Sequence, residues 1–561
     1  MTRSAGPRDA ETRPAGPAVV PPGGLGLSDD LPMPIGTIVD LEDDTQEIAD
    51  GVLFGGSPAR VLRLSAAGVA ALAELRAGPV TSAAGAVLAR RLTDTGLAQP
   101  RVARPSFRRE GPVAAVPAEG EPPTATEPAV DEPAGVAEPA ADAPAGVAEP
   151  GWGAAGTLAV TVVVPVRDRA AELDRCLAAA GRRYPVVVVD DGSADASALA
   201  AVCAARGAEL VRREVNGGPA AARNTGLRVV GTEFVAFLDS DCVPAGDWIS
   251  DLAGHFADPL VAAVAPRIVA APAAGPAPAG DRGSVLDLGD RAARVAPMTR
   301  VAYVPTAALV VRRAALGGGF DEALRYGEDV DLVWRLVAAG WRVRYDPGVR
   351  IGHAEPASRP ALLHRRFEYG RSAAPLTRRH PGAVAPLVLQ PWPTVTMAAL
   401  LARRPVTAAA AFGVSTALLA ARLRDNDLPA TGLVAPMANG VRQTWLGTGR
   451  WCGQFAAPVL LLALARPGGR TARTRWGRRL AAASLLAGPP LTEWAAQRDA
   501  GGRPGPVRFT ARALADQAAY GAGVYAGCLR ERMISPLLPA VSVKPFEGLR
   551  RRRAPRTGPR T

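Results

Sequence analysis

The apolar and polar positions of the first hundred residues follow the pattern of a small folded unit. Two short apolar runs, at residues 35–40 and 51–54, are separated by an acidic turn. Apolar residues at helical spacing follow over residues 65–75 and 83–92. Strands followed by helices predict a small N-terminal α+β domain with a winged-helix-like plan over residues 31–103.

From residue 160 onward, short apolar runs alternate with helical patterns. A β-branched run such as residues 160–166 is typical of a strand buried on both faces. The alternation predicts an α/β fold, a doubly wound and mostly parallel sheet with helices on both faces, over residues 157–382. Ligands of such sheets bind beyond the carboxyl ends of the strands. The expected strands are 160–166, 186–190, 209–212 and 234–238, and the expected helices are 169–180 and 194–206.

The last third of the chain holds long apolar runs without charge, at residues 383–402, 405–421 and 451–465. A membrane-spanning helix needs about 20 predominantly apolar residues. These runs are rich in alanine, and prolines break the first of them. They predict an apolar helical region over residues 383–548, in which packed helices and membrane-associated helices both stay open.

Charge is divided unevenly along the chain. The whole chain holds 65 Lys and Arg against 53 Asp and Glu, a net charge of +12. Residues 383–561 hold 25 basic and 7 acidic residues, which is +18, so the first 382 residues carry −6. Basic charge beside apolar runs favours an anionic membrane surface over nucleic acid as a partner. We therefore expect the cytoplasmic face of the membrane and no nucleic-acid partner.

Three further segments lack the pattern of a folded core. Residues 1–30 are rich in Pro and Gly and are predicted to be disordered. Residues 104–156 are predicted to form an acidic Pro/Ala-rich linker, because a short repeat of low hydrophobicity cannot offset chain entropy. Residues 549–561 form a basic tail.

Carboxylates follow the ends of the expected strands. Asp190 and Asp191 end the second strand, and Asp239, Ser240 and Asp241 follow the strand at 234–238. Two carboxylates one residue apart can bind a divalent cation such as Mg²⁺ or Mn²⁺ that is shared with substrate phosphates. An isolated Asp-x-Asp is most often a solvated turn, but a turn gives no reason for both motifs to follow strands of one sheet.

A glycine loop lies between these two motifs. Asn216, Gly217, Gly218 and Pro219 lead into a helix of small residues. The start of that helix is expected to lie near a diphosphate, with Arg223 within reach of the nucleotide. A structural turn explains the two glycines equally well.

A third group of polar residues lies further along the chain. Glu328 and Asp329 fall in the first turn of an expected helix, where carboxylates complement the helix dipole. They also suit a general base that takes a proton from an acceptor hydroxyl. His353 ends a later strand-like run, and a neutral imidazole there would complete a metal site, although a lone histidine is usually structural.

These motifs occur in the order found in family 2 glycosyltransferases of the GT-A fold, which residues 160–370 resemble. The resemblance implies inverting transfer of a sugar from a nucleotide-sugar donor with a divalent cation. It implies that Asp191 and Asp190 contact uridine and that Asp329, beside Glu328, is the catalytic base. The implied donor and metal residues are Pro165, Arg167, Arg223, Asp239, Ser240, Asp241 and His353.

The whole layout resembles the mycofactocin-biosynthesis glycosyltransferases, through residues 55–65 and 88–92 and the domain that follows. This implies glucose from UDP-glucose as the donor, and as the acceptor the peptide-derived redox cofactor mycofactocin or its precursor. The N-terminal domain more loosely resembles peptide-binding domains, which implies a precursor peptide or a biosynthetic partner. The alternatives are a polyprenyl phosphate or cell-envelope glycan as acceptor, and a non-catalytic peptide-binding scaffold.

Overall fold

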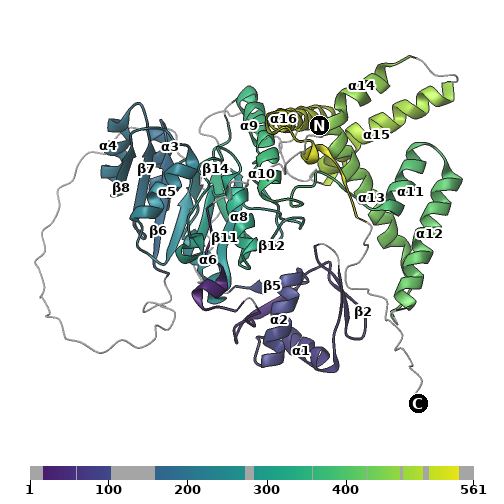
Figure 1. The fold of residues 1–561 in the computed structure, drawn as a ribbon, viewed down its shortest axis with the longest axis horizontal. Coiled ribbons are helices and arrows are strands. Elements are labelled where there is room, and N and C mark those ends of the chain that lie inside the picture. Colours follow the sequence, from purple (N-terminus) through teal and green to yellow (C-terminus); the bar gives the residue numbers. More distant parts are fainter. Residues whose placement is uncertain are drawn as a thin grey trace, which may run out of the picture.

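The computed structural model describes residues 17–28, 30–57, 60–102, 158–271, 284–356, 358–425, 428–467, 472–496 and 504–542. The expected acidic linker and basic tail lie outside these residues, as do residues 1–16. The description that follows concerns the described ranges (Figure 1).

The central sheet begins with four parallel strands in the order β8-β7-β6-β9. Alternate residues of β6 face opposite sides, so Val163 lies in one hydrophobic core and Val164 in the other. Helices cover both faces, as the alternating pattern requires (Figure 1). The elements are β6 (Val160–Val166), α3 (Ala170–Ala180), β7 (Val186–Asp191), α4 (Ala196–Arg206), β8 (Glu209–Arg213), α5 (Pro219–Val229) and β9 (Phe234–Leu238).

The second half of the sheet changes direction. Strand β13 (Ala308–Arg312) runs antiparallel to β9 and to β11 (Val261–Ala270), and β11 runs parallel to β14 (Arg342–His353). The α/β class and the mostly parallel sheet are confirmed, and β13 is the antiparallel strand between β9 and β11. The remaining elements here are β10 (Cys242–Pro244), α6 (Trp248–Ala253), η2 (Gly254–Ala257), β12 (Ala293–Val295), α7 (Arg313–Leu316), α8 (Glu328–Ala338), α9 (Arg359–Arg371) and α10 (Ala373–Arg379).

The N-terminal domain has its own hydrophobic core, in which Leu53, Leu72 and Leu92 are buried. Ser65 and Ser82 cap the two helices by accepting hydrogen bonds from backbone N–H groups of the first turn. The elements are β1 (Ile38–Leu41), β2 (Gln46–Ala49), β3 (Val52–Gly55), β4 (Arg60–Arg63), α1 (Ala66–Ala77), α2 (Ala83–Thr95) and β5 (Ala98–Arg101).

Residues 17–28, with the short helix η1 (Pro22–Leu25), pack on the central-sheet domain. The Gly318 N–H donates to the Ala18 carbonyl (2.7 Å), and the Trp341 indole N–H donates to the Val20 carbonyl (2.6 Å). The expected disorder of residues 1–30 therefore does not extend to these residues. The Pro/Gly-rich composition of this segment did not indicate the packing, because backbone carbonyls make these contacts and only two apolar side chains, Val19 and Leu27, pack against the core.

The C-terminal region is helical, as expected, and its last long helix, α16, crosses α9 in tight contact (Figure 1). A side chain at Gly370 or Gly523 would collide with backbone of the facing helix. Among the described residues, α12 alone is long and apolar enough to cross a membrane. The elements are β15 (Val388–Leu389), α11 (Pro391–Leu401), α12 (Pro405–Arg424), α13 (Val434–Trp451), the π-helical turn η3 (Cys452–Ala456), α14 (Ala457–Ala465), α15 (Ala472–Ala496), α16 (Pro506–Glu531), η4 (Ser535–Leu537) and β16 (Ala540–Val541).

Candidate active site

The expected site residues gather where the strands of the central sheet end. Asp241 follows β9, and His353 is the last residue of β14, where it pairs with Cys242 of β10. This register places the His353 Nε2 atom 3.6 Å from an Asp241 carboxylate oxygen. The first turn of α8 brings Glu328 and Asp329 to the same region, because Arg223 links Glu328 to Asp239.

Arg223 lies at the centre of this group, with only 3% of its surface exposed. Its guanidinium donates to Asp239 (2.6 Å) and to Glu328 (2.8 Å), and it lies 5.6 Å from the centre of the Phe320 ring. Burial opposes the charged form, but Asp239 and Glu328 outweigh that effect and raise the Arg223 pKa. Arg223 therefore holds the two carboxylate motifs together, a role that the spacing along the chain did not reveal.

Asp191 shapes the glycine loop. Its carboxylate accepts hydrogen bonds from the backbone N–H groups of Gly217 (3.0 Å) and Gly218 (2.7 Å) and from Arg213 Nε (2.8 Å). Gly218 has a φ of 88°, which L side chains rarely adopt. These contacts fix the loop that starts α5.

Asp190 is fully buried at the end of β7. It accepts hydrogen bonds from the Ser193 N–H (2.8 Å) and from Arg212 (2.8 Å). Like Asp191, this carboxylate stabilises a loop at the carboxyl edge of the sheet.

The other expected donor-site residues lie around the same edge. Pro165 pairs with Val189 in the sheet, Ser240 is buried, and the exposed Arg167 forms an ion pair with Asp168 (3.3 Å). Arg169, which the sequence analysis did not single out, donates to Asp241 (2.6 Å). A lone arginine after a strand carries no spacing signal, so it could be found only from the structure.

Glu328 and Asp329 both have raised pKa values. Burial and the neighbouring Asp329 charge raise the Glu328 pKa to about 7, although Arg223 lowers it. Burial also raises the Asp329 pKa, with a further contribution from Asp239. Two carboxyl groups this close titrate as a pair, and a carboxylate with a raised pKa is a better proton acceptor. The two carboxylates differ in their partners, since Glu328 accepts a hydrogen bond from Arg223 (2.8 Å) and Asp329 from the Val330 N–H (2.8 Å).

Replacing Arg223 tests this electrostatic arrangement. Arg223→Gln removes a positive charge that stabilises both carboxylates, so their pKa values rise and a higher pH is needed to ionise them. We expect the acidic limb of the kcat–pH profile to move to higher pH, and Arg223→Lys to move it less. A profile whose limb stays in place while the rate falls would show that Arg223 acts only by positioning.

The donor atoms around Asp241 fit part of a divalent-cation site. His353 Nδ1 lies 3.1 Å from Glu355, the kind of contact that orients a metal-binding histidine and leaves its Nε2 facing Asp241. Burial opposes the charged imidazole, but Glu355 and Asp241 outweigh it and raise the His353 pKa. Within the described residues, no group of three or more His, Cys, Asp or Glu side chains is gathered for a metal. Asp241 and His353 are the pair that could hold a cation, although Asp241 also pairs with Arg169 (2.6 Å) and Asp239 with Arg223 (2.6 Å).

Several tyrosines lie near Glu328 and Asp329, and the Asp329 charge adds to burial in raising the pKa values of Tyr303 and Tyr369. The rings of Tyr326 and Tyr369 meet edge to face at 6.2 Å, and Arg366 lies 5.2 Å from the centre of the Tyr520 ring. Burial raises the Tyr303 pKa to about 12, with contributions from Asp329 and Tyr520. Four of the chain's seven tyrosines therefore share this neighbourhood, although they lie far apart in the sequence.

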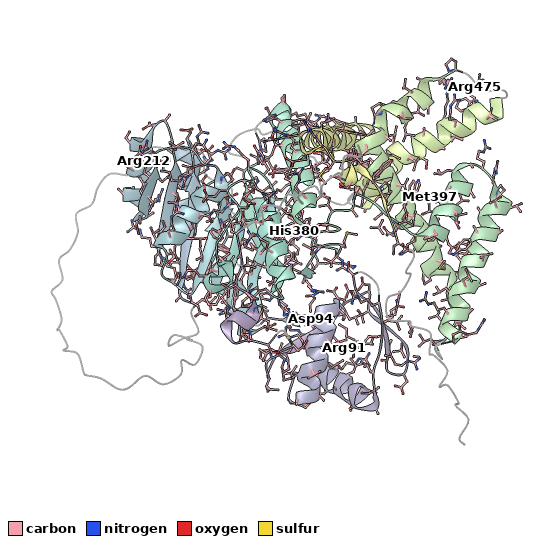
Figure 2. The ribbon with its side chains drawn as sticks, in the orientation of Figure 1. Arg91, Asp94, Arg212, His380, Met397 and Arg475 are labelled. Atoms are coloured by element: carbon pink, nitrogen blue, oxygen red, sulfur yellow. The ribbon has the colours of Figure 1, made fainter. Side chains whose placement is uncertain are left out.

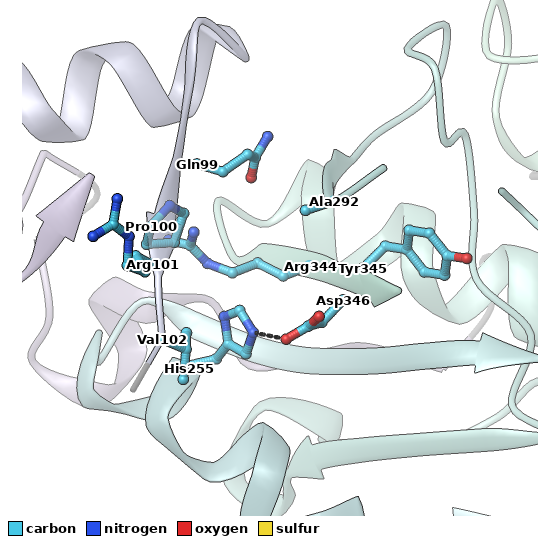
Figure 3. A pocket seen from close by; sticks show the side chains of 9 residues that line it. All are labelled: Gln99, Pro100, Arg101, Val102, His255, Ala292, Arg344, Tyr345 and Asp346. Carbon is cyan, nitrogen blue, oxygen red and sulfur yellow. Dashed lines mark hydrogen bonds and ion pairs between the residues drawn. The ribbon is translucent and has the colours of Figure 1, made fainter. Parts of the chain in front are cut away.

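A separate cavity of about 400 Å³ lies between the N-terminal domain and the start of β14 (Figure 3). His255 and Asp346 form a hydrogen-bonded pair in its wall (3.0 Å). The cavity borders Arg344, and Arg344 and His353 pair with Val264 and Ala270 of β11, six residues apart, which corresponds to about 20 Å of strand. It is therefore remote from the carboxylates described above.

Comparison with known proteins agrees with this geometry. Residues 161–315 match the model of glycosyl transferase family 2. The pre-mycofactocin glycosyltransferase of Mycobacterium tuberculosis is 35% identical over 531 residues, which cover 91% of this chain and 98% of that protein. The chain belongs to the family 2 glycosyltransferases. The resemblance to the mycofactocin-biosynthesis enzymes of this family, inferred from the layout, is confirmed over almost the whole chain.

More distant members match shorter parts of this family 2 glycosyltransferase. The succinoglycan biosynthesis protein ExoU of Rhizobium meliloti is 30% identical over 243 residues, 39% of this chain and 70% of that protein. Among solved structures, the mannosyltransferase PcManGT of Pyrobaculum calidifontis, in complex with GDP-Man and Mn²⁺, is 22% identical with a TM-score of 0.31. It covers 59% of this chain and 87% of that chain.

Proposed function

We propose that this chain is an inverting glucosyltransferase that moves glucose from UDP-glucose onto mycofactocin or its precursor, at the cytoplasmic face of the membrane. The observation that carries the proposal is the 35% identity to a pre-mycofactocin glycosyltransferase, which extends over both the N-terminal domain and the helical region. An enzyme that shared only the transferase domain would match only the middle of the chain.

The donor would bind along the carboxyl edge of the sheet. Asp190 and Asp191 end β7, and Asp191 accepts a hydrogen bond from the Gly218 N–H of the glycine loop. Both aspartates would contact the uridine of the donor. Pro165, Arg167 and Ser240 lie around the same edge. Asp241 and His353 would hold a divalent cation of the Mg²⁺ or Mn²⁺ kind, with Asp239 and the donor phosphates as further oxygen ligands. When bound, the cation neutralises charge that develops on the leaving diphosphate.

The acceptor would react on the side of Asp329. The Asp329 carboxylate takes the proton of the acceptor hydroxyl, whose oxygen attacks the anomeric carbon from the face opposite the diphosphate. The bond between that carbon and the diphosphate oxygen breaks, so the configuration at the carbon inverts. Arg223 holds Asp239 and Glu328 in place during this step.

The tyrosine group around Asp329 would form the wall of the acceptor site. A flat ring of the acceptor could stack on a tyrosine face, and polar groups of the acceptor could form hydrogen bonds with tyrosine hydroxyls. Tyr520 belongs to α16, so the helical region contributes to substrate binding through the crossing of α16 and α9. The N-terminal domain, by the same resemblance, would bind a precursor peptide or a biosynthetic partner.

Replacing Tyr520 tests the acceptor wall. We expect Tyr520→Leu to raise the acceptor KM about tenfold, because the loss of an aromatic contact costs about 1.5 kcal/mol. The donor KM should stay unchanged. Tyr525→Leu, five residues further along α16, is the matched control and should leave both constants unchanged. An equal loss in both variants would indicate a general effect on α16 packing instead.

Donor and acceptor identity can be tested together. The purified chain is incubated with radiolabelled UDP-glucose, UDP-galactose or GDP-mannose, and with pre-mycofactocin or a short polyprenyl phosphate. We expect transfer from UDP-glucose to pre-mycofactocin, lost on chelation of divalent cations. Transfer only to the polyprenyl phosphate would support the alternative acceptor, and no transfer or hydrolysis of any donor would support the scaffold alternative.

A further inference from the structure

Two turns of the helical region lie side by side. One joins α11 to α12, and the other lies where α14 and α15 approach each other. The Cδ atom of Arg403, in the first turn, would lie 3.2 Å from a Cβ atom placed on Gly477 of α15. Arg478 of α15 donates to the carbonyl groups of Ala463 (3.1 Å) and Arg466 (2.6 Å) at the end of α14. These contacts join the two hairpin ends into one surface.

Large apolar side chains on this surface are exposed. Val406 at the start of α12 is 81% exposed, and Leu462 near the end of α14 is 68% exposed. Leu400, Leu461, Trp476 and Leu480 are each more than half exposed. Exposed apolar groups in such a cluster mark an interaction site rather than ordinary surface.

The same surface is strongly basic. Arg403 and Arg404 lie in the α11–α12 turn, and Arg466 and Arg475 lie at the facing ends of α14 and α15. No Asp or Glu occurs in residues 391–424 or 434–492. Figure 2 labels Arg475 on the far side of the molecule from Arg212 of β8. We call these four arginines and the six apolar residues of the preceding paragraph the tip surface.

The packing of the helices argues against a membrane crossing. Helix α12, with 20 residues, is the one described helix that is long and apolar enough to span, and 28% of its apolar window is buried. A single crossing would place α11 and α13 on opposite sides of the bilayer, but these two helices pack together. Helix α11, with 11 residues, is about 16 Å long and too short to cross.

We propose that the tip surface docks on an anionic membrane from one side, without spanning it. Its apolar side chains would enter the boundary between headgroups and acyl chains, and its arginines would pair with lipid phosphates. Arginine stems can lie along the apolar layer while their charged ends stay at the headgroups, and Trp476 suits the same boundary. This docking would give the proposed membrane location a defined surface. Docking does not depend on which sugar or acceptor the enzyme uses.

The test measures binding of the full chain to vesicles by flotation, with phosphatidylcholine alone and with an equal mixture of phosphatidylcholine and phosphatidylglycerol. We expect binding to the anionic vesicles that sodium carbonate releases completely. Arg404→Gln together with Arg475→Gln should lower the partition coefficient about 25-fold, since each basic residue near an anionic surface contributes about fivefold. Leu461→Gln together with Leu462→Gln should abolish binding to the anionic vesicles.

The controls are matched in chemistry but lie elsewhere. Arg91→Gln on α2 and Val507→Gln with Leu529→Gln on α16 change exposed residues of the same types, and we expect full binding. Carbonate-resistant association, equal loss in the control variants, or concentration-dependent dimers that the Leu461 and Leu462 changes dissolve would each overturn the proposal. Transfer to a soluble acceptor should be the same in all variants, so a failure of membrane docking is distinguishable from a failure of the proposed reaction.

Discussion

Asp329→Asn should lower turnover about a thousandfold and leave the donor dissociation constant within twofold of its original value, in line with the usual contribution of a general base. The amide keeps the size of the carboxylate but cannot accept the acceptor proton. Donor binding is preserved because Asp241, His353 and the glycine loop are untouched. Single-turnover kinetics measure the chemical step, and calorimetry measures donor binding.

The matched control is Asp174→Asn, at a half-exposed ion pair between α3 and α4. This change should leave turnover and donor binding unaltered. Undiminished turnover in Asp329→Asn would refute Asp329 as the base. The structure then leaves Glu328 as the other carboxylate of the pair, to be examined by Glu328→Gln.

Asp258→Asn should destabilise the folded protein by about 3–5 kcal/mol, the usual cost of breaking a buried ion pair from one side. Asp258 accepts two hydrogen bonds from the Arg90 guanidinium of the N-terminal domain (2.8 and 2.7 Å). It accepts a third from the Arg344 guanidinium of β14 (3.0 Å). All three side chains are more than nine-tenths buried. The substitution would leave two buried guanidinium groups without a carboxylate. Urea unfolding followed by tryptophan fluorescence measures the change.

The exposed pair between Arg101 and Asp40 is the control for that prediction. Its side chains are 62% and 49% exposed and the pair is screened by solvent, so Asp40→Asn should leave the urea unfolding midpoint almost unchanged. Equal effects of the two substitutions would mean that Asp258 does not hold the domains together. A large effect of Asp258→Asn alone, with earlier proteolysis after residue 102, would show that the N-terminal domain detaches.

The sequence predicts the first half of the central sheet well, because its strands and helices are local patterns. Strands β6 and β9 occupy the expected residues, and α3 and α4 begin within two residues of the expected positions. The direction of β13 could not be predicted, because a buried parallel strand and a buried antiparallel strand can have the same apolar sequence. Direction depends on which neighbour the strand finds, which is a property of the whole fold.

In the candidate site, too, local motifs could be predicted from the sequence, whereas contacts between distant residues could not. The carboxylate motifs could be located because strand ends of one sheet meet at one edge. The function of Arg223 could not, because it depends on Asp239 and Glu328, which lie 16 and 105 residues away. The position of Tyr520 near the site could not be predicted either, because it depends on how α16 crosses α9.

The packing of residues 17–28 has a practical consequence for any shortened form of the enzyme. A chain that began at residue 158 would contain every carboxylate of the site, yet it would lose the backbone carbonyls that Trp341 and Arg335 use. Arg335 also holds Asp331, one turn from Glu328. The transferase domain is therefore assembled from two separated stretches of sequence. Supplying residues 17–28 as a separate peptide should restore to the shortened enzyme a stability that it lacks alone.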